Sequence, residues 1–259
     1  MRFYHFGEDG APVILLLPGT CCHWKLNFGE VIPLLESHFH IVCVSYDGFD
    51  ETESTIFPDM LTETEMIEAY IQERFDGHIH AAYGCSLGGS FVGLLIQRKS
   101  IHIDCAILGS SDLDQEPAWK AKLKCNIAIP LLHKIVSTGE YPKVLQRLME
   151  KKRTPYRDKF MAIFGIGTGG LPFMKRESVY NQFYFDLITS LEESIFVPGT
   201  AVHCFYATKM GEEYLQRYQK HFKDPVIHRF DMEHEELLVL YPERWAEEVN
   251  LAVLGSEKQ

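Results

Sequence analysis

Residues 79–90 read Ile-His-Ala-Ala-Tyr-Gly-Cys-Ser-Leu-Gly-Gly-Ser, a short apolar run that ends in the pattern Gly-x-Ser-x-Gly and continues into an apolar helix pattern. A strand, a tight turn and a helix in this order are typical of a nucleophile elbow, because small residues let the strand and the helix approach closely. We expect Ser86 to stand at the top of the turn, with its hydroxyl exposed beside the amides that open the helix. An ordinary glycine-rich turn is the alternative, since the short pattern alone is common by chance.

Length and charge narrow the class of protein. The 259 residues are enough for one large α/β core, and no Pro-, Gly- or Ser-rich linker divides them into two domains. The net charge of -11 argues against a nucleic-acid partner, which needs a basic face. We therefore expect a compact enzyme domain whose partner is a small molecule. The oligomeric state is left open.

The cysteines indicate a reducing compartment. The chain has 7 of them, an odd number without a Cys-x-x-Cys spacing, and several lie in apolar runs where a thiol behaves as a small hydrophobe.

The N-terminus has no secretory signal pattern, and the longest apolar run, 13–17, is far too short to span a bilayer. We expect a cytoplasmic protein without membrane contact. Cys21-Cys22-His23 lacks a second ligand group at zinc-like spacing, so we expect neither a metal nor a cofactor.

Apolar runs alternate with helix patterns along most of the chain. This alternation, with continuously apolar strands, predicts an α/β fold with a mostly parallel sheet covered by helices on both faces. Pro33 is expected to kink or break the helix over 23–38. The expected strands are 2–6, 11–17, 41–46, the run before the elbow, 103–108, 201–207 and 226–230; the expected helices are 23–38, 61–75, the one after the elbow, 211–221, 235–241 and 242–254.

Residues 112–198 depart from this alternation. They show helix patterns, including 120–136 and 141–152, and no convincing strand. We expect a helical cap inserted into a core made of residues 1–111 and 199–259. Most aromatic residues of the cap should pack its helices together, and some should line an apolar pocket above Ser86. These aromatics are Phe160, Phe164, Phe173, Tyr180, Phe183, Tyr184 and Phe185.

His234 is the expected general base. It lies in the loop after the last predicted strand, on the same sheet edge as Ser86, where it can take the hydroxyl proton that a weak nucleophile must lose. Asp231, Glu233, Glu235 and Glu236 surround it in sequence. We expect most of these carboxylates to be solvated and their negative charge to raise the pKa of His234.

These residues resemble the α/β-hydrolase family over nearly the whole chain. The resemblance rests on Leu17-Pro18-Gly19-Thr20 as an oxyanion loop, 41–50 as the next strand with its Asp-Gly loop, 84–88 as the elbow, and His234 as the terminal-loop histidine. The family order of Ser, then acid, then His is compatible with the sequence. The resemblance implies that the backbone amides of Thr20 and Leu87 hold the oxyanion.

The resemblance is weakest at the acidic residue of the expected Ser-His-acid triad. Family members usually place it just after the strand at 201–207, where this chain reads Thr208-Lys209-Met210-Gly211-Glu212-Glu213. Met210 occupies the expected position, and we take Glu212, the nearest carboxylate, as the acid. Asp112, just past the strand at 103–108, is the rival, and a Ser-His pair without an acid is a third possibility.

The sequence thus predicts a serine hydrolase, of the carboxylic ester hydrolase type, that cleaves a small ester or related acyl substrate through an acyl-enzyme. The aromatic cap implies an apolar acyl or alcohol part. A peptide or amide hydrolase of the same fold is an alternative, and it would need a cap carboxylate such as Glu177 or Asp186 to hold an amine. A ligand-binding protein that keeps the fold without turnover is another. The sequence does not distinguish an ester from a thioester or an amide.

Overall fold

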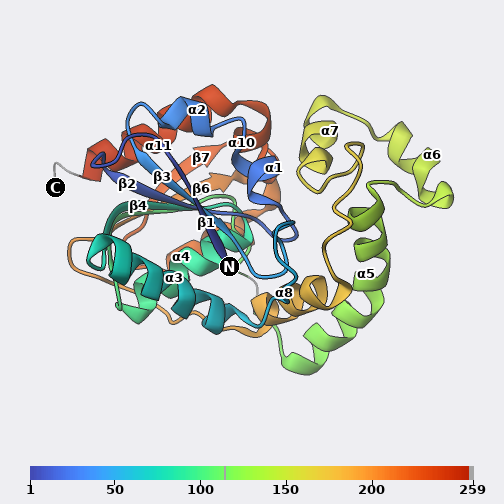
Figure 1. Cartoon of the computed structure of the whole chain (residues 1–259), viewed down its shortest axis with the longest axis horizontal. Helices are drawn as coiled ribbons and strands as arrows, with labels where there is room; N and C mark the ends of the chain where they lie inside the picture. The colour runs from blue at the N-terminus through green and yellow to red at the C-terminus, as the bar shows by residue number, and fades with distance from the viewer. Residues whose placement is uncertain (114, 257–259) are drawn as a thin grey trace.

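The computed structural model describes residues 1–113 and 115–256, and within them one sheet of 7 strands carries helices on both faces (Figure 1). The strand order is β1-β3-β2-β4-β5-β6-β7; β1 pairs with β3 in antiparallel fashion and every other pairing is parallel. This confirms the predicted fold class. The strands are β1 Arg2–Phe6, β2 Val13–Leu17, β3 His40–Ser45, β4 His78–Gly84, β5 His102–Leu108, β6 Ala201–Ala207 and β7 Val226–Phe230.

The helices fill the connections between these strands. The helices of the N-terminal half are α1 Trp24–Phe28, α2 Ile32–Leu35, α3 Met60–Phe75 and α4 Leu87–Arg98. Those between β5 and β6 are α5 Ala118–Thr138, α6 Lys143–Lys151, α7 Pro155–Ala162 and α8 Arg176–Ile188; after β6 come α9 Glu212–His221, α10 Glu236–Leu240 and α11 Pro242–Ser256. Asp59 caps α3, because its side chain accepts a hydrogen bond from the Thr62 N–H at 2.9 Å.

The prediction for residues 23–38 is wrong in detail. The chain forms two short helices, α1 and α2, separated by Gly29–Val31 rather than a single helix broken at Pro33. Pro33 lies in the first turn of α2, where a missing N–H costs nothing because that group has no partner within the helix. The break therefore falls before the proline.

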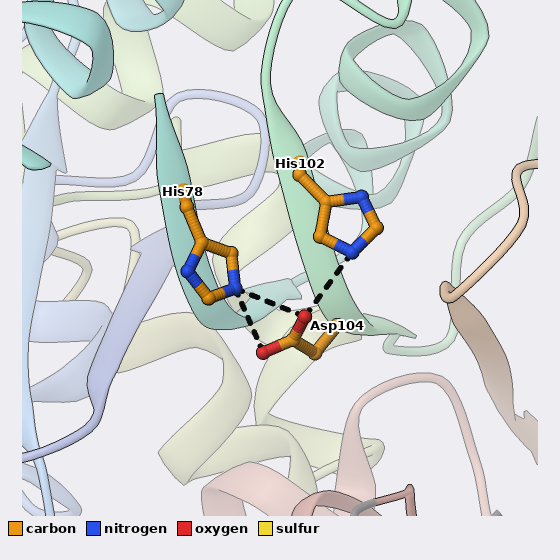
Figure 2. A group of neighbouring side chains, drawn as sticks. All are labelled: His78, His102 and Asp104. Carbon is orange, nitrogen blue, oxygen red and sulfur yellow. Dashed lines mark hydrogen bonds and ion pairs between the residues drawn. The ribbon is translucent and has the colours of Figure 1, made fainter. Parts of the chain in front are cut away.

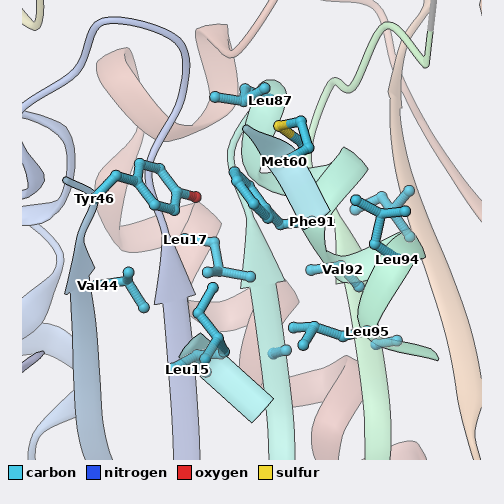
Figure 3. Close-up of a cluster of buried hydrophobic side chains, with 14 of the residues drawn as sticks. Leu15, Leu17, Val44, Tyr46, Met60, Leu87, Phe91, Val92, Leu94 and Leu95 are labelled. Atoms are coloured by element: carbon cyan, nitrogen blue, oxygen red, sulfur yellow. The ribbon is translucent and has the colours of Figure 1, made fainter. Parts of the chain in front are cut away.

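Two apolar cores lie on opposite faces of the sheet. One is formed by the sheet with α3 and α4, and Figure 3 shows Leu15 and Leu17 of β2 facing Phe91 and Leu95 of α4. The other is formed with α1, α2, α10 and α11 and contains the fully buried Trp245. Each fully buried Leu, Ile or Phe side chain in these cores contributes about 1.5–3 kcal/mol through the hydrophobic effect. The two cores fix the position of β4 relative to α4, and therefore the geometry of the turn between them.

The helices between β5 and β6 form the part of the molecule that departs from the strand-helix alternation. Figure 1 shows α5, α6 and α7 beside the sheet, whereas α8 turns back to lie near α3. α5 packs against α8, and α7 packs against α10, the helix that follows His234. Among the described residues, no helix combines the length and the apolar character needed to cross a bilayer.

Candidate active site

Ser86 stands in a strained turn between β4 and α4. Its backbone has φ +50° and ψ −111°, which is unusual for a residue with a side chain. The flanking glycines make the turn possible. A Cβ on Gly84 would lie 2.1 Å from the Gly88 carbonyl carbon, and a Cβ on Gly88 would lie 2.1 Å from the Leu17 carbonyl oxygen. The strand-turn-helix geometry expected of a nucleophile elbow is present.

The loop after β7 brings His234 to this serine. The His234 Nε2 lies 3.1 Å from the Ser86 Oγ, so the hydroxyl can donate a hydrogen bond to the neutral imidazole. The His234 side chain is 26% exposed, and Ser86 is partly buried. A nucleophile and a base separated by one hydrogen bond can transfer a proton without a prior movement of the chain.

The expected net shift of the His234 pKa is wrong, although the charge of Glu235 acts in the predicted direction. Burial lowers the pKa of His234 from its ordinary value, and the charge of Glu235 opposes this lowering only in part. The reason is that most of the imidazole is covered by the fold, and this loss of water disfavours the cation more than nearby charge favours it. His234 is therefore poised as a neutral base near neutral pH.

The structure places the two acid candidates differently. The Asp112 Oδ1 lies 4.0 Å from the His234 Nδ1, the imidazole nitrogen that faces away from Ser86. This separation is an ion-pair distance and is too long for a hydrogen bond. Glu212 begins α9 with an exposed side chain, and among the described residues neither a hydrogen bond nor an ion pair joins it to His234. The geometry favours Asp112 over our choice of Glu212.

Glu235 is a functional candidate that we did not identify from the sequence, where we expected most of the carboxylates near His234 to be solvated. It is buried, with 3% of its surface exposed. Its Oε1 accepts a hydrogen bond from the Ser86 backbone N–H at 2.8 Å, and its Oε2 accepts one from the Tyr83 hydroxyl at 3.2 Å. The Ser110 backbone N–H donates to the same carboxylate. Burial raises the pKa of Glu235, whereas His234 and the three donors act in the opposite direction.

The predicted oxyanion loop, 17–20, and the adjoining Cys21 are held in place by two amide side chains that the sequence did not single out. Asn27 accepts a hydrogen bond from the Gly19 N–H at 2.8 Å and donates one to the Cys85 sulfur at 3.4 Å. The buried Gln182 of α8 accepts one from the Cys21 N–H at 2.7 Å. No sequence periodicity marks either residue, because Asn27 contacts Cys85 across 58 residues and Gln182 contacts Cys21 across 161.

The predicted oxyanion donors lie on the two segments that these contacts join. Leu87 is the first residue of α4, directly after Ser86, and Thr20 follows Gly19 in the loop. Outside the regular helix and strand ladders of the described residues, the backbone hydrogen bonds do not use the N–H of either residue as a donor. The first N–H groups of a helix lack intrahelical partners and favour negative charge nearby.

One helix of the 112–198 segment contacts the base directly. The Phe160 ring of α7 packs edge-on against the His234 imidazole, with centroids 5.8 Å apart, and the Tyr156 hydroxyl donates to the His234 carbonyl at 2.8 Å. The other predicted pocket aromatics have different partners. Phe173 packs edge-on against His23, and Tyr184 packs with Tyr180 and Phe185 on α8.

The comparisons with known proteins agree with this architecture. A sequence profile described as alpha/beta hydrolase fold matches residues 12–125, the part of the chain that contains Ser86. A sequence search of curated proteins finds no significant match.

Solved structures resemble the whole chain at low sequence identity. A candidate alpha/beta hydrolase family protein from Desulfitobacterium hafniense has a TM-score of 0.76 at 15% identity, over 96% of this chain and 98% of that one. A hydrolase from Pseudomonas aeruginosa has a TM-score of 0.71 at 14% identity, over 98% and 93% of the two chains. An esterase from a marine microorganism has a TM-score of 0.69 at 11% identity, over 96% and 97%. Similarity at these identities establishes a shared fold.

Proposed function

This chain has the alpha/beta hydrolase fold, and we propose that it is a serine hydrolase that cleaves small carboxylic esters with an apolar acyl or alcohol part. One observation carries the proposal: the Ser86 hydroxyl at a strained strand-to-helix turn lies 3.1 Å from the His234 Nε2. A turn of this kind costs conformational free energy, and such strain is typical of positions that present a side chain to a reactant. A fold alone does not identify a reaction, so the proposal rests on the site.

The proposed reaction has two halves. The Ser86 Oγ forms a bond to the ester carbonyl carbon while its proton passes to the His234 Nε2, and the carbonyl oxygen becomes an oxyanion. The tetrahedral intermediate then breaks its bond to the alcohol oxygen, which takes the proton from His234. Water attacks the resulting acyl-enzyme with His234 as the base, and the acid leaves as Ser86 recovers its proton.

The surrounding groups take positioning and electrostatic roles. The N–H groups of Leu87 and Thr20 donate to the oxyanion, and loss of one such donor typically costs about 100- to 1000-fold in turnover. Asp112 stabilises the imidazolium that forms after proton transfer, since its carboxylate is on the Nδ1 side of His234. Burial of the imidazole keeps it neutral before the reaction, because burial lowers the pKa of His234.

The apolar preference follows from the segment above the site. Residues 112–198 act as a cap on a core of residues 1–111 and 199–259, of which 257–259 lie outside the described residues. The cap presents Phe160 beside His234, so the group that occupies the space next to the base meets an aromatic surface. The net charge of -11 disfavours anionic substrates on approach.

Covalent labelling with a fluorophosphonate tests the proposal. We expect one adduct on Ser86 by mass spectrometry, and hydrolysis of p-nitrophenyl acetate and butyrate that falls by at least about 1000-fold in Ser86→Ala. Ser90→Ala, which changes a serine in the first turn of α4, is the matched control and should retain both. A folded wild-type protein that neither labels nor turns over these esters would instead be a binding protein.

A further inference from the structure

A second group of chemically capable side chains lies at the opposite end of β4 from Ser86. His78 is the first residue of β4, and it pairs in register with His102, the first residue of β5. Asp104 follows two positions later on β5 and so shares a face with His102. At a strand rise of about 3.3 Å per residue, this group is roughly 20 Å from the end of β4 at Gly84.

The three side chains converge on one point. The His78 Nε2 lies 3.0 Å from the Asp104 Oδ1 and 2.9 Å from its Oδ2, and the His102 Nε2 lies 3.2 Å from the same Oδ1. Figure 2 shows both imidazoles directing a nitrogen toward the same carboxylate from neighbouring strands. The side chains of His78, His102 and Asp104 are 47%, 39% and 39% exposed, so a solute reaches them without a conformational change.

We propose that His78, His102 and Asp104 form a binding site for a zinc-like divalent cation. Two imidazole nitrogens and one carboxylate oxygen are a donor set suited to Zn²⁺, which accepts three protein ligands and completes a tetrahedron with water. The donor atoms lie within 4.8 Å of one another. Tetrahedral zinc with bonds of about 2.0–2.2 Å places its ligand atoms about 3.3–3.5 Å apart, which small side-chain rotations achieve.

The strands pre-organise this arrangement. The His78 and His102 backbones are fixed by the β4–β5 ladder, so binding orders only side chains. The position of Gly199 leaves space for one imidazole, because a Cβ there would lie 3.2 Å from the His102 Cε1. When the cation binds, each ligating Nε2 gives up the hydrogen it donates to Asp104, and that proton moves to Nδ1 or to solvent.

A neighbouring histidine is not part of the site. The His80 ring lies 5.3 Å from the His78 ring, but its Nδ1 accepts a hydrogen bond from the Val13 N–H at 3.0 Å. This contact holds His80 toward β2. The proposed ligand set therefore has three members, and the fourth position belongs to water.

Zinc titration of the full chain, after removal of metal with a chelator, tests the proposal. We expect one equivalent to bind by calorimetry and to raise the Tm by about 5 °C at a free concentration 100-fold above Kd. Co²⁺ bound in place of Zn²⁺ should show the visible absorption of a tetrahedral nitrogen and oxygen site. Hydrolysis by the Ser86 site should not change with occupancy, because the two sites lie at opposite ends of β4.

Matched variants locate the site. Loss of a residue that only hydrogen-bonds to a metal ligand typically costs roughly 10- to 100-fold in metal affinity. His102→Gln and Asp104→Asn each remove a proposed ligand, so each should weaken zinc binding by more than this. His38→Gln, a change at an exposed histidine elsewhere, should leave binding unchanged. The Tm difference with and without zinc is compared within each variant, so a less stable variant is still informative.

Three results would overturn the assignment. Zinc affinity that is unchanged in the His78→Gln/His102→Gln double variant would show that the cluster is only a cross-strand ion pair. Binding that is lost instead in His23→Gln would place the ion with His23, Asp50 and Glu51, whose donor atoms also lie within 4.8 Å of one another. Inhibition of ester hydrolysis that follows the same titration curve would place the ion at His234.

Discussion

The carboxylate of Glu235 accepts a hydrogen bond from the backbone N–H of Ser86 at 2.8 Å. Glu235 directly follows His234, so a single buried residue joins the turn that carries the proposed nucleophile, Ser86, to the loop that carries the proposed base. Its own backbone has φ +54°, a left-handed conformation that costs free energy for a residue with a side chain. We infer that Glu235 positions both catalytic groups.

Glu235→Gln tests this positioning role. Glutamine offers one acceptor oxygen to three donors, so we expect the free energy of unfolding to fall by about 1–3 kcal/mol. We expect kcat to fall by roughly tenfold or more with little change in KM, because the charge of Glu235 favours the His234 cation that forms during the reaction. Steady-state kinetics on p-nitrophenyl butyrate and chemical denaturation measure the two effects.

The pH profile separates positioning from a general loss of structure. The charge of Glu235 raises the pKa of His234, so its removal should move the acid limb of kcat/KM to lower pH. Glu233→Gln makes the same charge change at an exposed position of the same loop and should leave the profile in place. A Glu235→Gln profile that is lower in rate but unmoved in pH would mean that the residue is purely structural.

Asp112→Asn and Glu212→Gln distinguish the two acid candidates. We expect the Asp112 variant to lose about 10- to 100-fold in kcat/KM, because a carboxylate charge on the Nδ1 side of His234 is removed. This loss should be smaller than for a tightly hydrogen-bonded triad, since the two groups are 4.0 Å apart and Asp112 is 47% exposed. Glu212→Gln should keep wild-type activity, and the reverse result would restore Glu212 as the acid.

The wild-type pH dependence follows from the buried imidazole. Only neutral His234 accepts the Ser86 proton, and burial lowers its pKa below the ordinary 6.5. Activity should therefore be constant around neutral pH and fall on acidification, with the midpoint of the acid limb below 6.5. A midpoint above that value would mean that the acidic neighbours dominate after all. The measurement is kcat/KM from pH 4.5 to 8 on a neutral ester.

Gly88→Ala tests the close packing beneath the elbow. The added methyl would lie 2.1 Å from the Leu17 carbonyl oxygen, a backbone atom that cannot rotate away. We expect a loss of about 1–3 kcal/mol in the free energy of unfolding and a marked loss of labelling at Ser86. Gly255→Ala is the control, because its methyl meets nothing within 4 Å and alanine favours the helix. Equal stability of the two variants would contradict the packing argument.

The arrangement of strands could be predicted because it depends on local patterns. The predicted strands 2–6, 201–207 and 226–230 match β1, β6 and β7 at both ends, and Ser86 and His234 lie where strand-turn-helix order and sheet-edge reasoning placed them. Apolar runs and turn residues are properties of short segments. Each therefore appears in the sequence without knowledge of the rest of the chain.

The parts of the site that escaped prediction depend on long-range contacts. Glu235 is one of several carboxylates around His234, and only the left-handed turn at its own position directs it inward while Glu233 remains exposed. The Asp112 carboxylate lies 4.0 Å from His234 although the two residues are 122 positions apart in the chain, and no local pattern distinguishes Asp112 from Glu212. The predicted shift of the His234 pKa had the wrong direction, because the burial of a side chain cannot be judged from its neighbours in the sequence.

The contacts between α7 and the His234 loop have a consequence for selectivity. From this one helix, Tyr156 holds the His234 backbone carbonyl and Phe160 packs against the imidazole. An oversized acyl group that pushes this helix outward would also loosen the imidazole and weaken its hydrogen bond with the Ser86 hydroxyl. Such a molecule would still be held, but it would react slowly, so discrimination by size would appear in the rate of acylation more than in the strength of binding.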